Sequence, residues 1–347
     1  MITILDDTFS ELNAYLESNK PSKIIFLTDE NTHEHCLPFL LSNVTTEVPY
    51  EVIEIEPGEE LKTIDTATQL WEILSDFEAD RKTLMINLGG GVITDLGGFV
   101  ASTYKRGVSF INIPTTLLAM CDAAIGGKNG IDHQFLKNIV GTFANAEQIF
   151  IYPGFLETLP YTDLRSGFAE MLKHGLIADR KHWEDLTAIS ELRPENIAPF
   201  IERSTEIKQE IVQQDFKEQN IRKTLNFGHT IGHALESLFL KSGRPIPHGE
   251  AIAIGMICET RLSYLNKLIT EEVSDEIIKQ IKKYFPLHDI SSFKTKEILH
   301  LMTNDKKNSL GEISFSLIDG IGSSCHDQRV SDDEITEVLT FYNNMTA

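Results

Sequence analysis

Residues 83–91 read TLMINLGGG, and residues 92–104 continue as VITDLGGFVASTY. An apolar run that ends in three glycines and leads into a helical pattern predicts a strand that turns directly into a helix. Backbone N–H groups at the start of such a helix can hold a pyrophosphate when side chains leave them open. The GxGxxG spacing of the dinucleotide fingerprint is absent. A tight turn without a ligand is therefore an equally good interpretation of this stretch taken alone.

The segments around this unit repeat the alternation of strand and helix. Apolar residues with helical spacing cover 63–77. Three further apolar runs predict strands, namely KIIFLTD (23–29), VPYEVIEIEP (48–57) and VSFINIPTT (108–116). This alternation predicts a parallel, Rossmann-like α/β sheet in the first half of the chain.

The second half of the chain has long helical patterns instead. They cover residues 163–178, 194–214, 229–240, 249–266 and 270–284. One late run, ISFSLIDGIG (313–322), predicts a hairpin or a strand packed against a helix. The chain has 347 residues, which exceeds one ordinary core. We therefore predict an α/β domain over 1–158 and a mostly α-helical domain over 159–347.

Charge and composition exclude several classes of function. A net charge of −21 repels polyanions, so nucleic acid and anionic membranes are not expected partners. No apolar run approaches the about 20 residues that span a bilayer. The N-terminus lacks the basic region and cleavage site of a signal peptide, which makes the cytoplasm the expected location. The four cysteines are far apart and form no CxxC pair, which argues against a disulfide framework or a cysteine zinc site.

Several positive side chains stand against this acidic background. The segment DAAIGGKNG (122–130) places two glycines before a lysine, and LKN (136–138) follows it. The spacing is not that of a P-loop, and a surface loop with a solvated lysine is the alternative. Cations that converged in space would form a pocket for phosphate and carboxylate groups. The candidate cations are Arg106, Lys128, Lys137, Lys173, Lys208, Arg222, Lys306 and Lys307.

Histidines and one carboxylate indicate a metal site. His229 and His233 are four residues apart on a predicted helix, and His248 begins the next one. Two imidazoles and a carboxylate form a catalytic type of zinc site that leaves one position open. Glu170 lies in a mostly apolar helical segment, where a carboxylate needs a partner or a metal, although a surface ion pair is the alternative. Spacing alone leaves open which two of the three histidines bind the metal.

Taken together, these segments resemble the 3-dehydroquinate synthase family of sugar-phosphate cyclases. The resemblance runs from about residue 23 to residue 322. The segments that carry it are PGEELKT, LGGGVITDLGGFVASTYKRGV, IPTTLLA, DAAIGGKNGID, LKN, SGFAEMLKHG, QEIVQQDFKEQNIRKTLNFGHTIGHALE, HGEAIAIGM and DKKN. Their order and spacing are more specific than any single motif.

The resemblance implies two cofactors, NAD and a zinc or cobalt ion. It implies Glu170, His229 and His248 as metal ligands, and His233 as a substrate contact instead. The implied NAD contacts are Asp29, Gly58, Glu59, Lys62, Gly90, Gly91, Val92, Asp95, Thr115, Thr116, Lys128, Lys137, Phe155, Leu156 and Thr158. The implied substrate contacts are Asp122, Lys128, Lys137, Asn138, Lys173, Lys208, Arg222, Asn226 and Lys306 or Lys307. Arg106 is implied as a phosphate contact in the neighbouring subunit of a homodimer.

The reaction implied by the resemblance converts 3-deoxy-D-arabino-heptulosonate 7-phosphate into 3-dehydroquinate and phosphate. NAD transiently oxidises the C5 hydroxyl, phosphate is eliminated, the ketone is reduced again, and an intramolecular aldol step closes the ring. A cyclase for sedoheptulose 7-phosphate, a metal-dependent polyol dehydrogenase and a non-catalytic descendant are the alternatives. Three positions depart from the family pattern: Asn129 for threonine, Asp132 for asparagine, and Asn220 for a glycine. Asparagine tolerates the left-handed backbone that such a glycine predicts.

Overall fold

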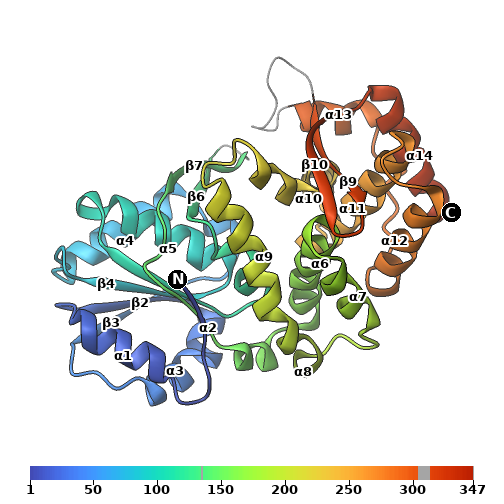
Figure 1. Cartoon of the computed structure of the whole chain (residues 1–347). Helices are drawn as coiled ribbons and strands as arrows, with labels where there is room; N and C mark the ends of the chain where they lie inside the picture. Colours follow the sequence, from blue (N-terminus) through green and yellow to red (C-terminus); the bar gives the residue numbers. More distant parts are fainter. Residues whose placement is uncertain (134–135, 304–312, 347) are drawn as a thin grey trace. The chain divides into compact units, whose positions relative to one another are not determined.

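The computed structural model describes residues 1–133, 136–303 and 313–346, and Figure 1 draws it. The chain divides into two compact units, Met1–Pro160 and Tyr161–Ala347. Among the described residues, no helix combines the length and the apolar character needed to cross a lipid bilayer. The predicted fold class is confirmed, because the first unit has a parallel sheet with helices and the second is mostly helical.

The first unit is built on a six-stranded parallel sheet in the order β1-β8-β5-β4-β2-β3. The strands are β1 (Ile2–Ile4), β2 (Ile24–Asp29), β3 (Tyr50–Ile55), β4 (Leu84–Gly89), β5 (Ser109–Pro114) and β8 (Ile149–Ile151). Every residue of β4 is buried, as expected for a central strand covered on both faces. The strands predicted at 23–29, 48–57, 83–91 and 108–116 are thereby confirmed.

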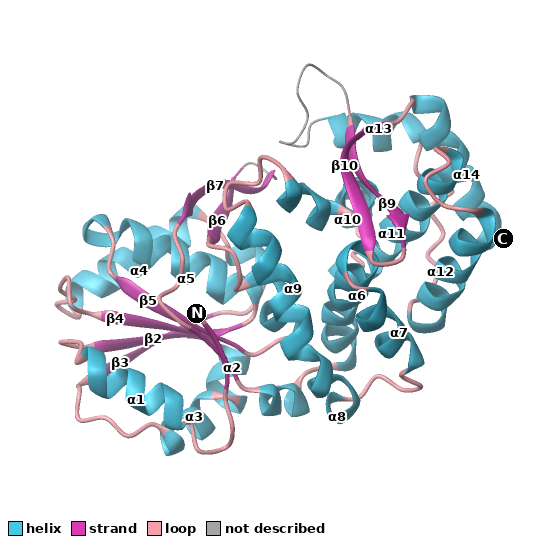
Figure 2. Cartoon of the chain, in the orientation of Figure 1, coloured by secondary structure: helices cyan, strands magenta, loops and turns pink. Residues whose placement is uncertain are grey.

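Helices cover this sheet, with α4 and α5 on one side and α1 and α3 on the other (Figure 2). The helices are α1 (Ser10–Asn19), α2 (Glu30–His35), α3 (Leu37–Asn43), α4 (Ile64–Asp76) and α5 (Gly91–Thr103). Close packing of α5 on β4 needs a glycine, because a Cβ at Gly97 would lie 2.1 Å from Asn87 Oδ1. Helix α4 confirms the helix predicted over 63–77, whereas α1, α2 and α3 were not predicted.

The glycine-rich segment after β5 contains more regular structure than the sequence indicated. A helical turn covers Ala119–Ala123, and an antiparallel hairpin follows with strands β6 (Lys128–His133) and β7 (Leu136–Phe143). The interpretation of residues 122–130 as a surface loop is therefore wrong, because Lys128 begins a strand paired with Phe143. Gly130 and Gly141 face each other across this hairpin, where a Cβ on Gly141 would lie 2.3 Å from the Asn129 carbonyl oxygen.

The second unit packs its helices around the long, buried helix α11. The helices are α6 (Tyr161–Ala178), α7 (Arg180–Ala188), α8 (Pro194–Ile197), α9 (Ile201–Gln214), α10 (His229–Lys241), α11 (His248–Leu265), α12 (Glu271–Tyr284), α13 (Thr295–Thr303) and α14 (Asp332–Thr346). An antiparallel hairpin of β9 (Ser314–Gly320) and β10 (Ser323–Arg329) confirms the hairpin interpretation of 313–322. Helices α7, α13 and α14 and strand β10 were not predicted.

One predicted helix of this unit is interrupted. The pattern at 194–214 predicted a continuous helix, but α8 and α9 are separated by the tighter turn Ala198–Phe200. Pro199 explains the break, because proline has no N–H to donate to the preceding turn. The other helical patterns, at 163–178, 229–240, 249–266 and 270–284, agree with α6, α10, α11 and α12 to within two residues.

Candidate functional site

The carboxyl ends of the parallel strands gather the residues expected to bind the dinucleotide. Asp29 ends β2, Gly90 follows β4 and Thr115 follows β5. The N–H of Thr115 donates to the Gly89 carbonyl oxygen over 3.0 Å, which holds the ends of β4 and β5 side by side. Phe155, Leu156 and Thr158 belong to the turn after β8 (Pro153–Thr158), so they follow the same edge of the sheet. Ligands of open α/β sheets bind at this edge.

The start of α5 has the open backbone that an anion needs. Gly90 is the N-cap residue, and Gly91 begins the helix. A Cβ at Gly90 would approach Thr116 Cγ2 to 3.0 Å, so a larger residue would press on Thr116. The first N–H groups of α5 point along the helix axis towards this end, where the helix dipole favours negative charge.

A buried ion pair stands beside the first turn of α5. Lys62 Nζ lies 2.6 Å from Asp95 Oδ2, and the Lys62 side chain is 3% exposed. Burial lowers the pKa of Lys62, but the charges of Asp95 and Glu59 outweigh it and raise the pKa above its ordinary value. Gly58 precedes this segment with a φ of +136°. The structure therefore brings Glu59, Lys62 and Asp95 together, and their contact with NAD stays a prediction.

The β6–β7 hairpin carries Lys128, Lys137 and Asn138, all exposed within this unit. Asp132 joins the hairpin to the Lys62 segment, since its N–H donates to the Lys62 carbonyl oxygen and its Oδ1 accepts the N–H of Asn138, both over 2.7 Å. Asn138 is thereby held at a φ of +51°. The departure at Asp132 thus has a structural role, which is to fix the backbone of Asn138.

Asn129, the second departure, closes the base of the hairpin. Its Nδ2 donates to the Ala144 carbonyl oxygen over 2.8 Å and to the Gly127 carbonyl oxygen over 3.3 Å. Asp122 lies in the turn before the hairpin. Arg106 follows the carboxyl end of α5, which is about 20 Å long at 1.5 Å per residue. Arg106 is therefore distant from the glycines that begin α5.

The candidate metal site lies within the second unit. Glu170 on α6 is fully buried, and its Oε1 lies 3.3 Å from His229 Nε2 and 3.7 Å from His248 Nε2. The alternative of a surface ion pair for Glu170 is therefore wrong. His229, His233 and His248 each offer a ring nitrogen, and these nitrogens lie within 4.8 Å of one another. The geometry gathers all three histidines and does not separate His233 from the other two.

Hydrogen bonds prepare two of these imidazoles for a metal. His229 Nδ1 lies 3.0 Å from the Phe227 carbonyl oxygen, which can only accept, so Nδ1 carries the proton and Nε2 is left to ligate. His248 Nδ1 lies 3.5 Å from Glu236 Oε2, and its Nε2 faces Glu170. An outer carboxylate or carbonyl on the second ring nitrogen is the usual support of a metal-binding histidine. The donors present therefore fit a zinc or cobalt ion.

Burial and neighbouring charges set the protonation states of these three candidate ligands. Burial raises the pKa of Glu170, but Lys173 and His229 outweigh it and hold the pKa well below its ordinary value. Burial lowers the pKa of His229, and the charge of Glu170 offsets this only partly. For His248, the burial effect is outweighed by hydrogen bonds to Glu170 and Glu236, which raise the pKa to about 10. A metal ion bound here would displace the proton from His248.

Glu259 on α11 holds the start of α10, which carries His229. The sequence analysis did not predict this residue as part of the site. This fully buried carboxylate accepts the N–H of Gly228 over 2.5 Å and the N–H of Ile231 over 3.1 Å. It thus caps the start of α10, where His229 is the first residue. A single glutamate in an apolar helix, thirty positions after the histidine, gave no local signal for this contact.

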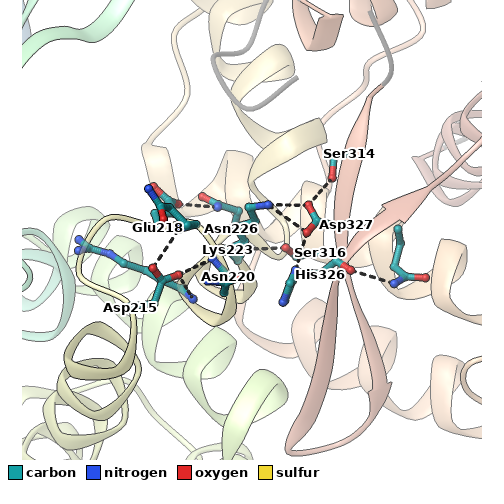
Figure 3. A network of polar contacts seen from close by, with 12 residues as sticks. Asp215, Glu218, Asn220, Lys223, Asn226, Ser314, Ser316, His326 and Asp327 are labelled. Atoms are coloured by element: carbon teal, nitrogen blue, oxygen red, sulfur yellow. Dashed lines mark hydrogen bonds and ion pairs between the residues drawn. The ribbon is translucent and has the colours of Figure 1, made fainter. Parts of the chain in front are cut away.

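Three cations of the same unit are buried on α6, on α9 and in the turn Ile221–Asn226, and the half-buried amide of Asn226 ends that turn. Lys173, Lys208 and Arg222 are 1%, 5% and 2% exposed. Lys173 Nζ pairs with Glu170 Oε2. Asn226 Nδ2 donates to Glu218 Oε1 over 2.7 Å (Figure 3). A group of positive side chains of this kind can bind a negatively charged ligand. The predicted contacts Lys306 and Lys307 lie outside the described residues.

Asn220, the third departure, does not need the left-handed backbone that asparagine tolerates. Asn220 has φ −138° and ψ −115°, whereas Glu218 takes the left-handed conformation with φ +59°. The left-handed residue of this loop is therefore Glu218, two residues before Asn220.

Comparison with known proteins agrees with this arrangement. The family model for the 3-dehydroquinate synthase N-terminal domain matches residues 52–166, and the C-terminal model matches residues 167–308. A 3-dehydroquinate synthase from Parabacteroides distasonis is 41% identical over 98% of this chain and 97% of its own. This chain belongs to the 3-dehydroquinate synthase family. The family inferred from the sequence motifs is thereby confirmed.

Solved structures show the same fold at lower identity. A 2-epi-5-epi-valiolone synthase from Streptomyces hygroscopicus, with NAD+ and Zn2+ bound, aligns with a TM-score of 0.84 and 24% identity over 99% of this chain and 97% of that one. A 2-deoxy-scyllo-inosose synthase complexed with carbaglucose-6-phosphate, NAD+ and Co2+ aligns with a TM-score of 0.82 and 23% identity, over 99% of this chain and 96% of that one.

Proposed function

We propose that this chain is a 3-dehydroquinate synthase, an NAD- and metal-dependent lyase that converts 3-deoxy-D-arabino-heptulosonate 7-phosphate to 3-dehydroquinate and phosphate. The observation that carries the proposal is the convergence of Glu170 Oε1 with the Nε2 atoms of His229 and His248 inside a family-matched unit. The sugar-phosphate cyclase structures with bound NAD+ and Co2+ or Zn2+ support both cofactors.

Each domain has its own part in this proposal. The domain over 1–158 would hold NAD at the carboxyl edge of its sheet, with the pyrophosphate at Gly90, Gly91 and Val92 and further contacts from Asp29, Lys62 and Asp95. The domain over 159–347 would hold zinc or cobalt through Glu170, His229 and His248. When bound, the two groups supply hydride transfer to and from C5 and Lewis-acid stabilisation of the substrate oxygens.

The other side chains of the helical domain would bind and orient the substrate. Lys208, Arg222 and Asn226 offer donors for the substrate carboxylate. His233 would take the proton of the C5 hydroxyl, because imidazole titrates near neutral pH. Lys173 stabilises the ionised state of Glu170 and adds a positive charge beside the metal ligands. These groups position and polarise the substrate while it undergoes elimination and ring closure.

The phosphate group would be held by residues of the first domain and by one of two lysines that lie outside the described residues. Lys128, Lys137 and Asn138 on the β6–β7 hairpin are the proposed contacts, with Asp122 before them and Lys306 or Lys307 from the other domain. Arg106 would contribute from a second subunit. Its position at the far end of α5 from Gly90 supports a role outside its own chain's dinucleotide site.

Exposed apolar residues on the hairpin support a homodimer. Ile139, Val140 and Phe143 on β7 are 38%, 43% and 52% exposed, and β7 pairs with β6 alone among the described strands. An open, apolar strand edge favours a second copy. We expect Phe143→Glu to shift the mass measured by light scattering from dimer to monomer. Mixing the inactive variants Arg106→Ala and Glu170→Gln would restore part of the activity if Arg106 acts in the partner's site, and no restoration would contradict that role.

Phosphate release is the direct test of the reaction. We expect release from the heptulosonate phosphate, a requirement for NAD, loss of activity after thorough treatment with EDTA, and recovery on adding Zn2+ or Co2+. Release from sedoheptulose 7-phosphate alone would contradict the proposed substrate. Net NADH absorbance at 340 nm would indicate a dehydrogenase, because the proposed cycle returns its hydride. Full activity after metal removal would contradict the metal site.

The free cysteines bear on the location of the protein. Cys36, Cys121, Cys258 and Cys325 are all free thiols, and the first three are buried. Free thiols agree with a reducing compartment, so we propose the cytoplasm. Fractionation of cells that express a tagged chain would test this directly.

A further inference from the structure

The loop between α9 and the turn Ile221–Asn226 is organised by one buried carboxylate. Asp215 is 8% exposed. Its Oδ1 accepts the N–H of Gln219 over 2.9 Å, and its Oδ2 accepts the N–H groups of Asn220 over 2.6 Å and Arg222 over 3.1 Å (Figure 3). Burial raises the pKa of Asp215, but these N–H groups outweigh it and hold the pKa below its ordinary value. The carboxylate is therefore ionised at neutral pH.

The backbone of this loop has little regular structure of its own. Glu218 is left-handed at φ +59°, a conformation that residues other than glycine seldom adopt. Such conformations persist only where the surroundings impose them. Three charge-assisted hydrogen bonds to one acceptor group are the contacts that impose the path of residues 219–222.

The backbone and the side chain of Arg222 both form hydrogen bonds with this loop. Its backbone N–H is bound by Asp215, and its guanidinium Nη1 donates to the Phe216 carbonyl oxygen over 2.6 Å. The residue after it is anchored through its backbone from the other side, since Ser316 Oγ on β9 donates to the Lys223 carbonyl oxygen over 2.6 Å. Arg222 thus sits between a loop closed by Asp215 and a hairpin anchor.

We propose that Asp215 is the positioning residue for recognition of the substrate carboxylate. It acts through the backbone of residues 219–222, which sets where the Arg222 guanidinium is presented. This inference rests on the proposed function, in which Arg222 and Asn226 bind that carboxylate. It assigns Asp215 an effect on substrate binding that depends on the ligand's carboxylate and leaves metal binding and NAD binding unchanged.

The test compares Asp215→Asn with Asp327→Asn. Asparagine keeps one acceptor oxygen but loses the charge and places an NH2 group against a backbone donor. Asp327 is a matched control, because it belongs to the same network (Figure 3) but contacts the Lys223 side chain at the surface, with its own side chain 50% exposed. We expect Asp215→Asn to raise KM for the heptulosonate phosphate tenfold or more, and Asp327→Asn to change it less than twofold.

Two further measurements separate positioning from general damage. Sedoheptulose 7-phosphate, which lacks the carboxylate, should inhibit the wild-type protein and Asp215→Asn with similar inhibition constants. Asp215→Glu, which keeps the charge, should raise KM less than Asp215→Asn does. Equal losses for both ligands, an unchanged KM, or failure of both variants to fold would each overturn the proposal, the last because it would assign Asp215 to the stability of the whole unit. Absence of phosphate release by the wild-type protein would instead overturn the proposed function.

Discussion

The two units offer different kinds of groups to charged ligands. In the sheet unit, the expected contacts are mostly backbone groups and small residues at strand ends, such as Gly90 and Thr115. In the helical unit, they are ionised side chains taken out of water, with Glu170 and Lys173 at 0% and 1% exposure. A backbone site depends on the room left by absent side chains, whereas a site of buried charges depends on each charge keeping its partners. The two units should therefore respond differently to substitution.

Removal of a metal ligand is expected to have the largest effect. His229→Ala would leave Glu170 and His248 without the third donor, and the Lewis acid it helps to hold contributes several kcal/mol, so phosphate release should fall about 10^3-fold or more. Bound metal, measured by mass spectrometry, should fall with it. His35→Ala in the sheet unit, which removes an exposed histidine, is the control. Normal activity in a metal-free His229→Ala protein would contradict the assignment.

Buried titratable groups should make the helical unit the more acid-sensitive of the two. His182 on α7 is 2% exposed, and burial lowers its pKa to about 4 from 6.5. Between these values the unfolded chain binds a proton that the folded chain does not. The contribution of His182 to the free energy of unfolding is therefore fully present above pH 6.5. It is lost as the pH falls towards 4, which lowers the free energy of unfolding by about 3 kcal/mol at most.

Tryptophan fluorescence can follow this effect in one unit at a time. The chain has two tryptophans, Trp71 on α4 and Trp183 on α7. In a Trp71→Phe background, Trp183 fluorescence reports urea unfolding of the helical unit. The free energy of unfolding measured in this way should fall from pH 7 to pH 4.5. His182→Leu should make this dependence on pH less steep. The same pH dependence with and without His182 would rule out this residue as its source.

Loss of the Glu259 carboxylate should lower the metal affinity less than loss of a metal ligand does. In Glu259→Gln, the amide NH2 would face the N–H of Gly228 or Ile231, and the start of α10 would shift. Outer contacts of this kind typically change metal affinity by about 10- to 100-fold. Competition with a chelator measures it. Glu271→Gln, which alters an exposed ion pair with Arg261, should leave metal affinity unchanged.

The smallest effect is expected when a methyl group is added at Gly90 in the sheet unit. In Gly90→Ala, the new Cβ would lie 3.0 Å from Thr116 Cγ2, which must yield by a few tenths of an ångström. We expect KM for NAD to rise by about tenfold or less, which corresponds to about 1 kcal/mol, while metal content stays normal. Gly320→Ala is the control, because a Cβ there meets nothing within 4 Å. A loss of metal with unchanged NAD binding would reverse the contrast between the two units.

Local sequence patterns were sufficient where one element forms from contiguous residues. The stretch TLMINLGGG became β4 and the start of α5 because a continuous apolar run, glycine and helical spacing act within a few residues. The same reasoning did not predict the β6–β7 hairpin, and it left a surface loop as the alternative interpretation of residues 122–130. Pairing across the β6–β7 hairpin requires glycines, since Gly130 and Gly141 approach each other closely. Strand pairing of this kind depends on a partner that a local pattern does not name.

The sequence by itself determined the family, the two kinds of domain and the residue types available for chemistry. Only the tertiary structure decided which of those residues meet. It brought Glu170 on α6 against histidines at the starts of α10 and α11, left the Nε2 of His229 to ligate, and placed Glu259 and Asp215 on backbone donors. The reason is that a buried carboxylate is stable only beside donors that satisfy it, and those donors come from chain segments that folding alone brings together.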